Sequence, residues 1–121
     1  MIQLLGMFEK PIDWRGSAFK DIKDDGIFSV EARKEAGHQL NQVQMGLDPD
    51  DWKPFDEVGA GTKEIRINLD DGWFRVMYVA KFPEAVYVLH CFKKKSRVTS
   101  KQDKEIASSR YKAVIKERIK K

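Results

Sequence analysis

The sequence predicts a single α+β domain in which an N-terminal strand and a helical hairpin precede an antiparallel three-strand meander and a basic C-terminal helix. Three observations support this fold class. Apolar residues recur at helical spacing in residues 18–45, they alternate or run together in three short segments of residues 63–93, and turn formers separate those segments. The 121 residues are enough for one core, so we expect one domain over residues 1–121, with residues 1–6 as a flexible extension.

The first half of the chain carries the signals of one strand and two helices. Residues 7–14 read as an edge strand, because the proline they contain cannot donate to a sheet ladder. Ser17 can cap a short helix over residues 18–23, and Ser29 can cap a longer helix over residues 30–45. The apolar stripe of the longer helix consists of Ala36, Leu40, Val43 and Leu47.

Residues 48–61 are acidic and rich in turn formers, which indicates a loop. Two aromatic side chains, Trp52 and Phe55, lie within it. They can pin the loop to the body of the domain or stack on a nucleotide base.

The meander consists of three strands at residues 63–69, 73–81 and 85–93. Asp71-Gly72 is expected to form a two-residue turn between the first two strands, since this dipeptide tolerates positive φ. Pro83-Glu84 is expected to form the second turn.

These turns define which side chains share a face of the sheet. They place Asn68 opposite Arg75, Arg75 opposite Phe92, and Met77 opposite His90. The face expected to be exposed or half-exposed then carries Arg66, Arg75, His90, Phe92 and Lys94. The opposite face is expected to pack beneath the helices and contains Ile65, Ile67, Leu69, Phe74, Val76 and Tyr78. The core side of the third strand is expected to hold Tyr87, Leu89 and Cys91.

Positive charge is concentrated at the C-terminal end. Residues 1–89 contain 11 Lys and Arg against 16 Asp and Glu, a net charge of −5, whereas residues 90–121 contain 12 against 3, a net charge of +9. Lys93–Lys95 follow directly on the third strand, and Thr99 and Gln102 have the spacing of a capping box for the final helix. A basic region of this kind fits a phosphate backbone, and it also fits a helix that keeps the protein soluble.

The remaining composition narrows the class of protein. Cys91 is the one cysteine, so no internal disulfide can form, and its place in a strand favours a buried, inert thiol. No run approaches the length of a membrane span, and the N-terminus lacks the basic start of a secretory signal. Two histidines 52 positions apart and one cysteine make no metal-ligand set. We therefore expect a cytoplasmic protein without a metal or other cofactor.

Three segments resemble a known family when they are taken in order. They are EIRI at residues 64–67, FRVMY at residues 74–78 and VLHCFKKK at residues 88–95. Together they resemble the HigB-like, phage-derived branch of the RelE/ParE toxin superfamily, and the similarity covers about residues 10 to 115. The chain departs from the family pattern at Lys93, where Gln is usual, and at Ser29, where a proline is common.

The resemblance implies a RelE-like fold and a type II toxin that a helix-turn-helix antitoxin neutralises. It implies a metal-free endoribonuclease that enters the ribosome and cuts translated mRNA. Such cleavage requires removal of the proton from the ribose 2′-oxygen, stabilisation of charge on the scissile phosphate, and protonation of the leaving 5′-oxygen. Two alternatives stay open, a member of the superfamily that poisons DNA gyrase and an inactive remnant that only binds its antitoxin.

Arginine and lysine are the side chains that suit phosphate chemistry without a metal. We expect Arg66 and Arg75 to clamp the phosphate, and Lys94 and Lys95 to stabilise charge, with one lysine acting as base if its like-charged neighbours lower its pKa. His90 is a candidate acid. The candidate RNA-binding residues are Phe92, which could stack a base, and Lys93, Arg97 and Lys101. Structural alternatives are an Arg66 paired with Glu64 or a loop aspartate, a hydrogen-bonded His90, and a solvated strand exit at Lys93–Lys95.

Overall fold

The computed structural model describes residues 9–120 and contains a five-stranded sheet and three helices. The elements in chain order are β1 (Ile12–Trp14), α2 (Ala18–Ile22), α3 (Val30–Gln44), β2 (Trp52–Pro54), β3 (Thr62–Leu69), β4 (Gly72–Val79), β5 (Val86–Lys94) and α4 (Lys101–Lys120). The strand order is β1-β5-β4-β3-β2, in which β1 runs parallel to β5 and every other neighbouring pair is antiparallel. The α+β class and the order of the predicted elements are confirmed, and the arrangement is compatible with a RelE-like fold.

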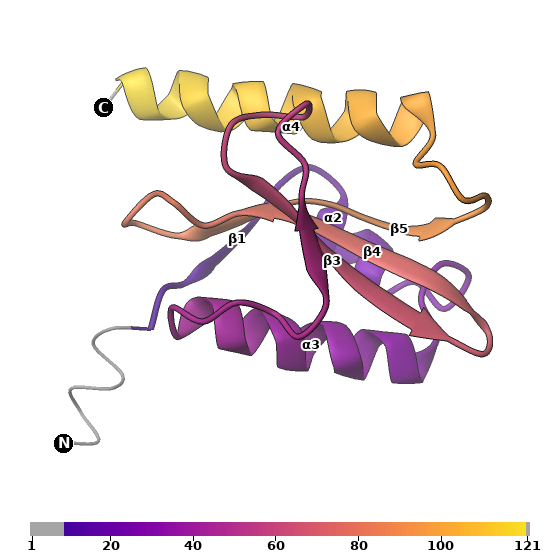
Figure 1. Cartoon of the computed structure of the whole chain (residues 1–121). Helices are drawn as coiled ribbons and strands as arrows, with labels where there is room; N and C mark the ends of the chain where they lie inside the picture. The colour runs from indigo at the N-terminus through magenta and orange to yellow at the C-terminus, as the bar shows by residue number, and fades with distance from the viewer. Residues whose placement is uncertain (1–8, 121) are drawn as a thin grey trace, which may run out of the picture.

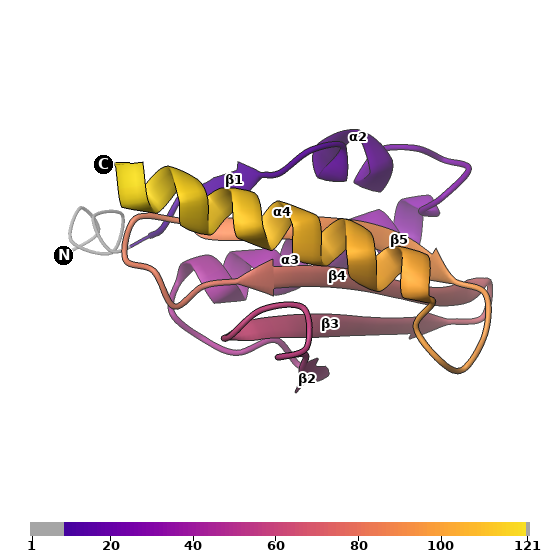
Figure 2. The ribbon, with the colours of Figure 1, turned by 90° about the horizontal axis from the view of Figure 1, so that it is seen from above.

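The sheet separates two hydrophobic layers. Helices α2 and α3 pack on one face and α4 lies across the other (Figure 1). Seen from above, α4 follows β5 and β4 and leaves much of β3 and β2 uncovered (Figure 2). No helix among residues 9–120 is long and apolar enough to cross a membrane.

The helical hairpin agrees with its prediction except at its ends. Ser29 caps α3 as expected, since its hydroxyl accepts a hydrogen bond from the Ala32 backbone N–H at 3.2 Å. Ser17 makes no such capping bond, and its hydroxyl instead donates to Asp21 at 2.7 Å. The prediction that Leu47 belongs to the buried stripe is wrong, because α3 ends before it and its side chain is 62% exposed.

The segment predicted as a loop, residues 48–61, contains one strand, β2. The three residues of β2 pair with β3 at the edge of the sheet, where a short segment that ends in Pro54 costs no ladder bond. Phe55 is buried and joins the core beneath α4, which confirms that this aromatic side chain pins the segment. The predicted N-terminal strand is shorter than expected, with β1 at the sheet edge, and residues 1–8 lie outside the described part of the chain.

The two-residue loop of the first turn lies one position earlier in the chain than predicted. Asp70 and Asp71 form the two-residue loop, and Leu69 pairs with Gly72, so that Arg66 faces Arg75. Because the register moves by two residues in total, every side chain of β3 and β4 keeps its predicted face.

The second turn preserves the predicted pairs Arg75 with Phe92 and Met77 with His90. A bulge then places Tyr78 opposite Val88, which leaves Leu89 as an extra residue in β5. Tyr87 and Leu89 therefore pack beneath α4, and of the three predicted core residues only Cys91 lies on the α3 side. The sequence could not show this reversal, since a bulge is not visible in an apolar run.

The cap of α4 lies one residue later than predicted. Ser100 accepts a hydrogen bond from the Asp103 backbone N–H at 3.0 Å, and its hydroxyl donates to the Asp103 carboxylate at 2.7 Å. The helix buries Ala107, Tyr111 and Val114 against the sheet, and Ile115 is partly buried.

Candidate functional site

Four basic side chains from four neighbouring strands surround one buried carboxylate on the α4 side of the sheet. They are Lys53 of β2, Arg66 of β3, Arg75 of β4 and Lys94 of β5, and the carboxylate is that of Glu64. The ladder positions Lys53 beside Glu64 and Arg66 beside Arg75, so alternation along each strand turns these side chains to one face. We call these five residues the cation cluster.

Glu64 is the buried acid of the cation cluster. Its side chain is fully buried, and neither carboxylate oxygen has a hydrogen-bond partner among the described residues. The carboxylate oxygen Oε1 lies 3.7 Å from Arg75 Nε and 3.8 Å from Lys53 Nζ. Burial raises the pKa of Glu64, and the surrounding cations, Lys53 first and Arg75 second, oppose that rise.

The two arginines of the cluster differ in exposure. Arg66 is half-exposed, and its Nε donates to Asp51 at 3.0 Å, which is the loop aspartate that the sequence offered as an alternative partner. Arg75 is 5% exposed and donates from Nη1 to the Asn68 side-chain oxygen at 2.8 Å and to the Phe74 carbonyl at 2.9 Å. The expectation that Arg75 lies exposed is therefore wrong, and desolvation lowers its pKa.

Of the three residues Lys93–Lys95, Lys94 is the one that belongs to the cation cluster. Partial burial, reinforced by Arg75, lowers the pKa of its ammonium group, and its Nζ donates to the Arg97 carbonyl at 2.6 Å. Lys93 faces Phe74 across the ladder and therefore points to the α3 side, where its ammonium lies 5.6 Å from that ring. Lys95 and Arg97 are exposed in the segment that follows β5.

His90 is buried, against the expectation of an exposed face. Its Nε2 lies 2.8 Å from an Asp103 carboxylate oxygen, and its ring stacks on Phe92 at 4.8 Å between centroids. Burial lowers the pKa of His90, although the hydrogen bond to Asp103 partly offsets this effect. Phe92 is itself 5% exposed, so both rings form part of the contact between β5 and α4.

The remaining predicted RNA-binding residue lies outside the cluster. Lys101, at the first position of α4, is exposed and pairs with Glu105 at 3.9 Å.

One cavity, of about 660 Å³, borders the end of β5 and the start of α4. Lys93, Lys94 and Lys95 line it together with His90.

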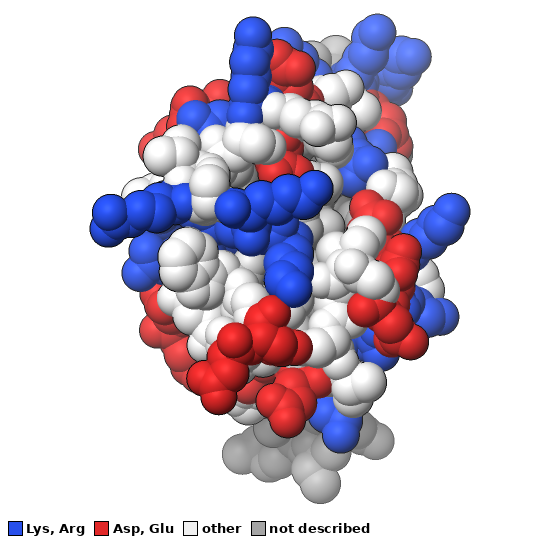
Figure 3. Space-filling model, turned by 90° about the vertical axis from the view of Figure 1, so that its right-hand side faces the viewer, with Lys and Arg blue, Asp and Glu red and all other residues white. Residues whose placement is uncertain are grey.

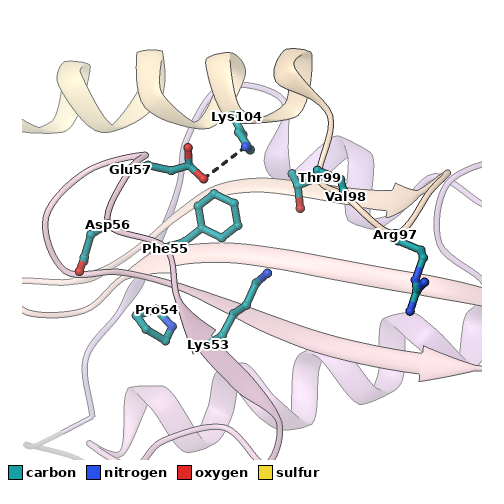
Figure 4. Close-up of a pocket in the computed structure, with 9 residues that line it drawn as sticks. All are labelled: Lys53, Pro54, Phe55, Asp56, Glu57, Arg97, Val98, Thr99 and Lys104. Atoms are coloured by element: carbon teal, nitrogen blue, oxygen red, sulfur yellow. Dashed lines mark ion pairs between the residues drawn. The ribbon is translucent and has the colours of Figure 1, made fainter.

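A second cavity, of about 410 Å³, opens beside the cation cluster between β2 and the segment before α4. Lys53 extends from β2 on one side of this opening, and Thr99 and Arg97 extend from the facing segment (Figure 4). Phe55 lies on its floor, with the ammonium groups of Lys53 and Lys104 at 5.2 and 6.0 Å from the ring centroid. The opening is therefore cationic and next to the cluster, although Lys104 also pairs with Glu57 at 3.3 Å.

Lys and Arg side chains form a band across the middle of the end of the molecule that lies on the right in Figure 1, and one group of Asp and Glu side chains lies below this band (Figure 3). No group of three His, Cys, Asp or Glu side chains in residues 9–120 is placed to hold a metal ion.

Sequence reasoning missed three residues of this region. Lys53 was hidden because β2 was taken for a loop, and Glu64 was read only as a partner for Arg66. Trp73 pairs with Lys94 across β4 and β5, shares the face of the cluster, and is 44% exposed. The sequence held signals for two of these residues. Glu64 lies two positions before Arg66 in the same strand, and the predicted hairpin places Trp73 on the same face as Arg75.

Comparison with known proteins gives one family. A search of the curated proteins finds no significant match to the chain. The model of the family described as phage derived protein Gp49-like matches residues 26–112, which include α3, the whole meander and the first half of α4. The chain therefore belongs to the Gp49-like phage-derived family, within the RelE/HigB-like group of toxin–antitoxin toxins.

Proposed function

We propose that this toxin belongs to the HigB-like branch and is a metal-free endoribonuclease that cuts mRNA on the ribosome, with the cation cluster as its phosphate-binding site. The observation that supports this proposal is the convergence of Lys53, Arg66, Arg75 and Lys94 around Glu64 on one face of the sheet. A phosphodiester gains charge in the transition state of its cleavage, so fixed cations around it lower the barrier. Family membership implies an antitoxin as partner, and we propose one of the helix-turn-helix class.

The exposed members of the cluster are proposed to contact the phosphate directly. Arg66 can exchange Asp51 for phosphate at little cost, because a half-exposed ion pair contributes at most about 1 kcal/mol. Its guanidinium then offers two parallel N–H donors. Arg75 supplies charge from beneath, since its side chain is buried and held by Asn68.

Lys94 is the proposed base. Its lowered pKa increases the fraction of neutral amine that can take the proton of the ribose 2′-oxygen. Lys95 and Arg97 are proposed to hold the RNA backbone beyond the scissile phosphate. We assign His90 a structural role, because its Nε2 is already engaged by Asp103.

Base recognition is proposed to involve the exposed ring of Trp73, in place of the buried Phe92. Aromatic side chains stack on unpaired bases without strong sequence preference. The exposed lysines of α4 are proposed to contact ribosomal RNA, and they are Lys101, Lys112, Lys116 and Lys120.

Induction of the toxin in cells tests this function. We expect growth arrest with new 5′ ends inside translated mRNAs, detected by primer extension, and we expect Lys94→Ala to remove both effects. Lys34→Ala is the matched control, because it deletes an exposed lysine of α3, on the opposite face of the sheet from the cluster. Growth arrest with intact mRNA would refute the nuclease and point to the gyrase-poison class, and full toxicity of Lys94→Ala would refute the assigned site.

A further inference from the structure

Glu64 is an anomaly in a site built to bind an anion. The site places a carboxylate, completely withdrawn from water, among the cations that are proposed to receive the substrate phosphate. Buried carboxylates normally accept several hydrogen bonds, whereas neither oxygen of Glu64 has a partner in the described part of the chain, and Arg75 Nε is also without one. The contacts at 3.7 and 3.8 Å are attractive but too long for hydrogen bonds.

The charged groups around Glu64 come from every strand that borders it. Lys53 faces it from β2, Arg66 from its own strand, Arg75 from β4 and Lys94 from β5. Asp51, which lies against Arg66 and also acts on Arg75, is a neighbouring acid. The ionised form of Glu64 therefore depends on cations that it shares with Asp51 and, in the proposed function, with RNA.

Two anions that share one set of cations disfavour each other's charge. A phosphodiester that binds Lys53, Arg66 and Lys94 brings a negative charge close to Glu64 and takes up part of the attraction that keeps this carboxylate ionised. A phosphodiester cannot gain a proton near neutral pH, whereas a carboxylic acid can. Of the two anions, Glu64 is therefore the one that can lose its charge by taking up a proton.

We propose that Glu64 acts as a proton-linked counter-ion of the cation cluster: it is ionised while the cluster is empty, and it takes up one proton from solvent when a phosphodiester binds. This inference rests on the proposed phosphate site and adds a property that the proposed function does not require. Glu64 does not touch the phosphate, so it is a positioning residue that keeps four cations together in the empty protein and is neutralised by a proton from solvent when the phosphodiester binds.

The proton linkage has a defined pH dependence. The pKa of Glu64 is higher in the complex than in the free protein, so between those two values the affinity for phosphodiester falls about tenfold for each unit of rising pH. Below the lower pKa the carboxyl is neutral in both states, and above the higher one it is ionised in both, so the affinity is constant in each range.

Calorimetry with a 2′-deoxy oligonucleotide tests the proposal, because this probe carries the phosphodiester but lacks the attacking 2′-oxygen. Titration in two buffers with different ionisation enthalpies, repeated over a range of pH, gives the number of protons taken up at each pH. In wild type the uptake should rise to close to one proton per bound probe between the two pKa values of Glu64. Glu64→Gln should bind with no uptake and without the pH dependence, and Glu105→Gln, an exposed carboxyl of α4, should behave as wild type.

The outcomes separate this inference from the proposed function. Binding without proton uptake in wild type would overturn the proton linkage and leave the phosphate site standing, and this measurement needs no variant. Uptake that persists in Glu64→Gln would assign the proton to another group and overturn the role of Glu64. Absence of binding that involves Lys53, Arg66 and Lys94, seen as unchanged NMR signals of these side chains, would overturn both.

Discussion

Replacement of Arg66 by alanine separates the chemistry of the cation cluster from the stability of the fold. In the free protein the guanidinium makes one half-exposed ion pair with Asp51, with side-chain exposures of 40% and 48%. Loss of such a pair costs at most about 1 kcal/mol of unfolding free energy, or roughly 3–6 °C in Tm for a domain of this size. Loss of a donor to the charge that develops on the phosphate should instead reduce kcat by about 10²–10³-fold, which is about 3–4 kcal/mol.

The assay is single-turnover cleavage of a synthetic mRNA placed on purified ribosomes, followed by primer extension, with thermal unfolding measured on the same preparations. Lys63→Ala is the matched control. Lys63 lies on the same strand as Arg66 and also pairs with a loop aspartate, Asp48 at 2.9 Å, but it faces Tyr78 on the α3 side of the sheet. The control should lose similar stability and keep its activity. An Arg66→Ala protein that cleaves within a few-fold of wild type, or that is no slower than the Lys63→Ala protein, would refute the assignment.

Four further predictions concern neighbouring residues. If Lys94 is the base, the cleavage rate should rise with pH up to the pKa of Lys94, which lies below its usual 10.5, and Lys94→Arg should abolish this rise; an unchanged pH profile in the variant would exclude the role. Asp103→Asn should lower the unfolding free energy by about 1–2 kcal/mol in urea titrations, because it weakens the buried contact with His90. In wild type, folding lowers the pKa of His90. The contribution of His90 to the unfolding free energy should therefore be constant above its unfolded-state pKa of about 6.5 and should decrease as pH falls below that pKa. An unfolding free energy that increases as pH falls below that pKa would contradict this sign. Trp73→Ala should weaken binding of single-stranded RNA by about 1–3 kcal/mol while Tm hardly changes, since the ring is 44% exposed, and unchanged affinity would remove Trp73 from the base contacts.

Side-chain periodicity predicted more of the site than the turns did. The turn at Asp71-Gly72 was placed wrongly, yet Arg66 and Arg75 fell on the correct face, because a shift of two residues in register restores the alternation. The pair of Arg75 with Phe92 was predicted directly. A shift of one residue, as at the Leu89 bulge, reverses the faces, and for this reason Tyr87 and Leu89 were assigned to the wrong layer.

Burial was the property that local patterns could not supply. Arg75 and His90 read as exposed because they are polar members of a face that carries other charges. Both are buried, and each has polar partners that compensate for part of its desolvation, Asn68 for Arg75 and Asp103 for His90. Asp103 lies 13 residues after His90 and on α4 instead of on a neighbouring strand, so this contact had no local signal.

The sequence by itself determined the α+β class, the order of the elements, the concentration of positive charge near the end of β5 and the toxin group, since these depend on periodicity, composition and motifs along the chain. Only the tertiary structure decided that Lys53 completes a set of four cations and that Glu64 lies among them without a hydrogen bond from the described residues 9–120. The physical reason is that the electrostatic state of a buried group depends on neighbours contributed by several strands and on its loss of water. Glu64 alternates correctly as a polar residue of β3, and nothing in that alternation shows that its carboxylate is fully buried.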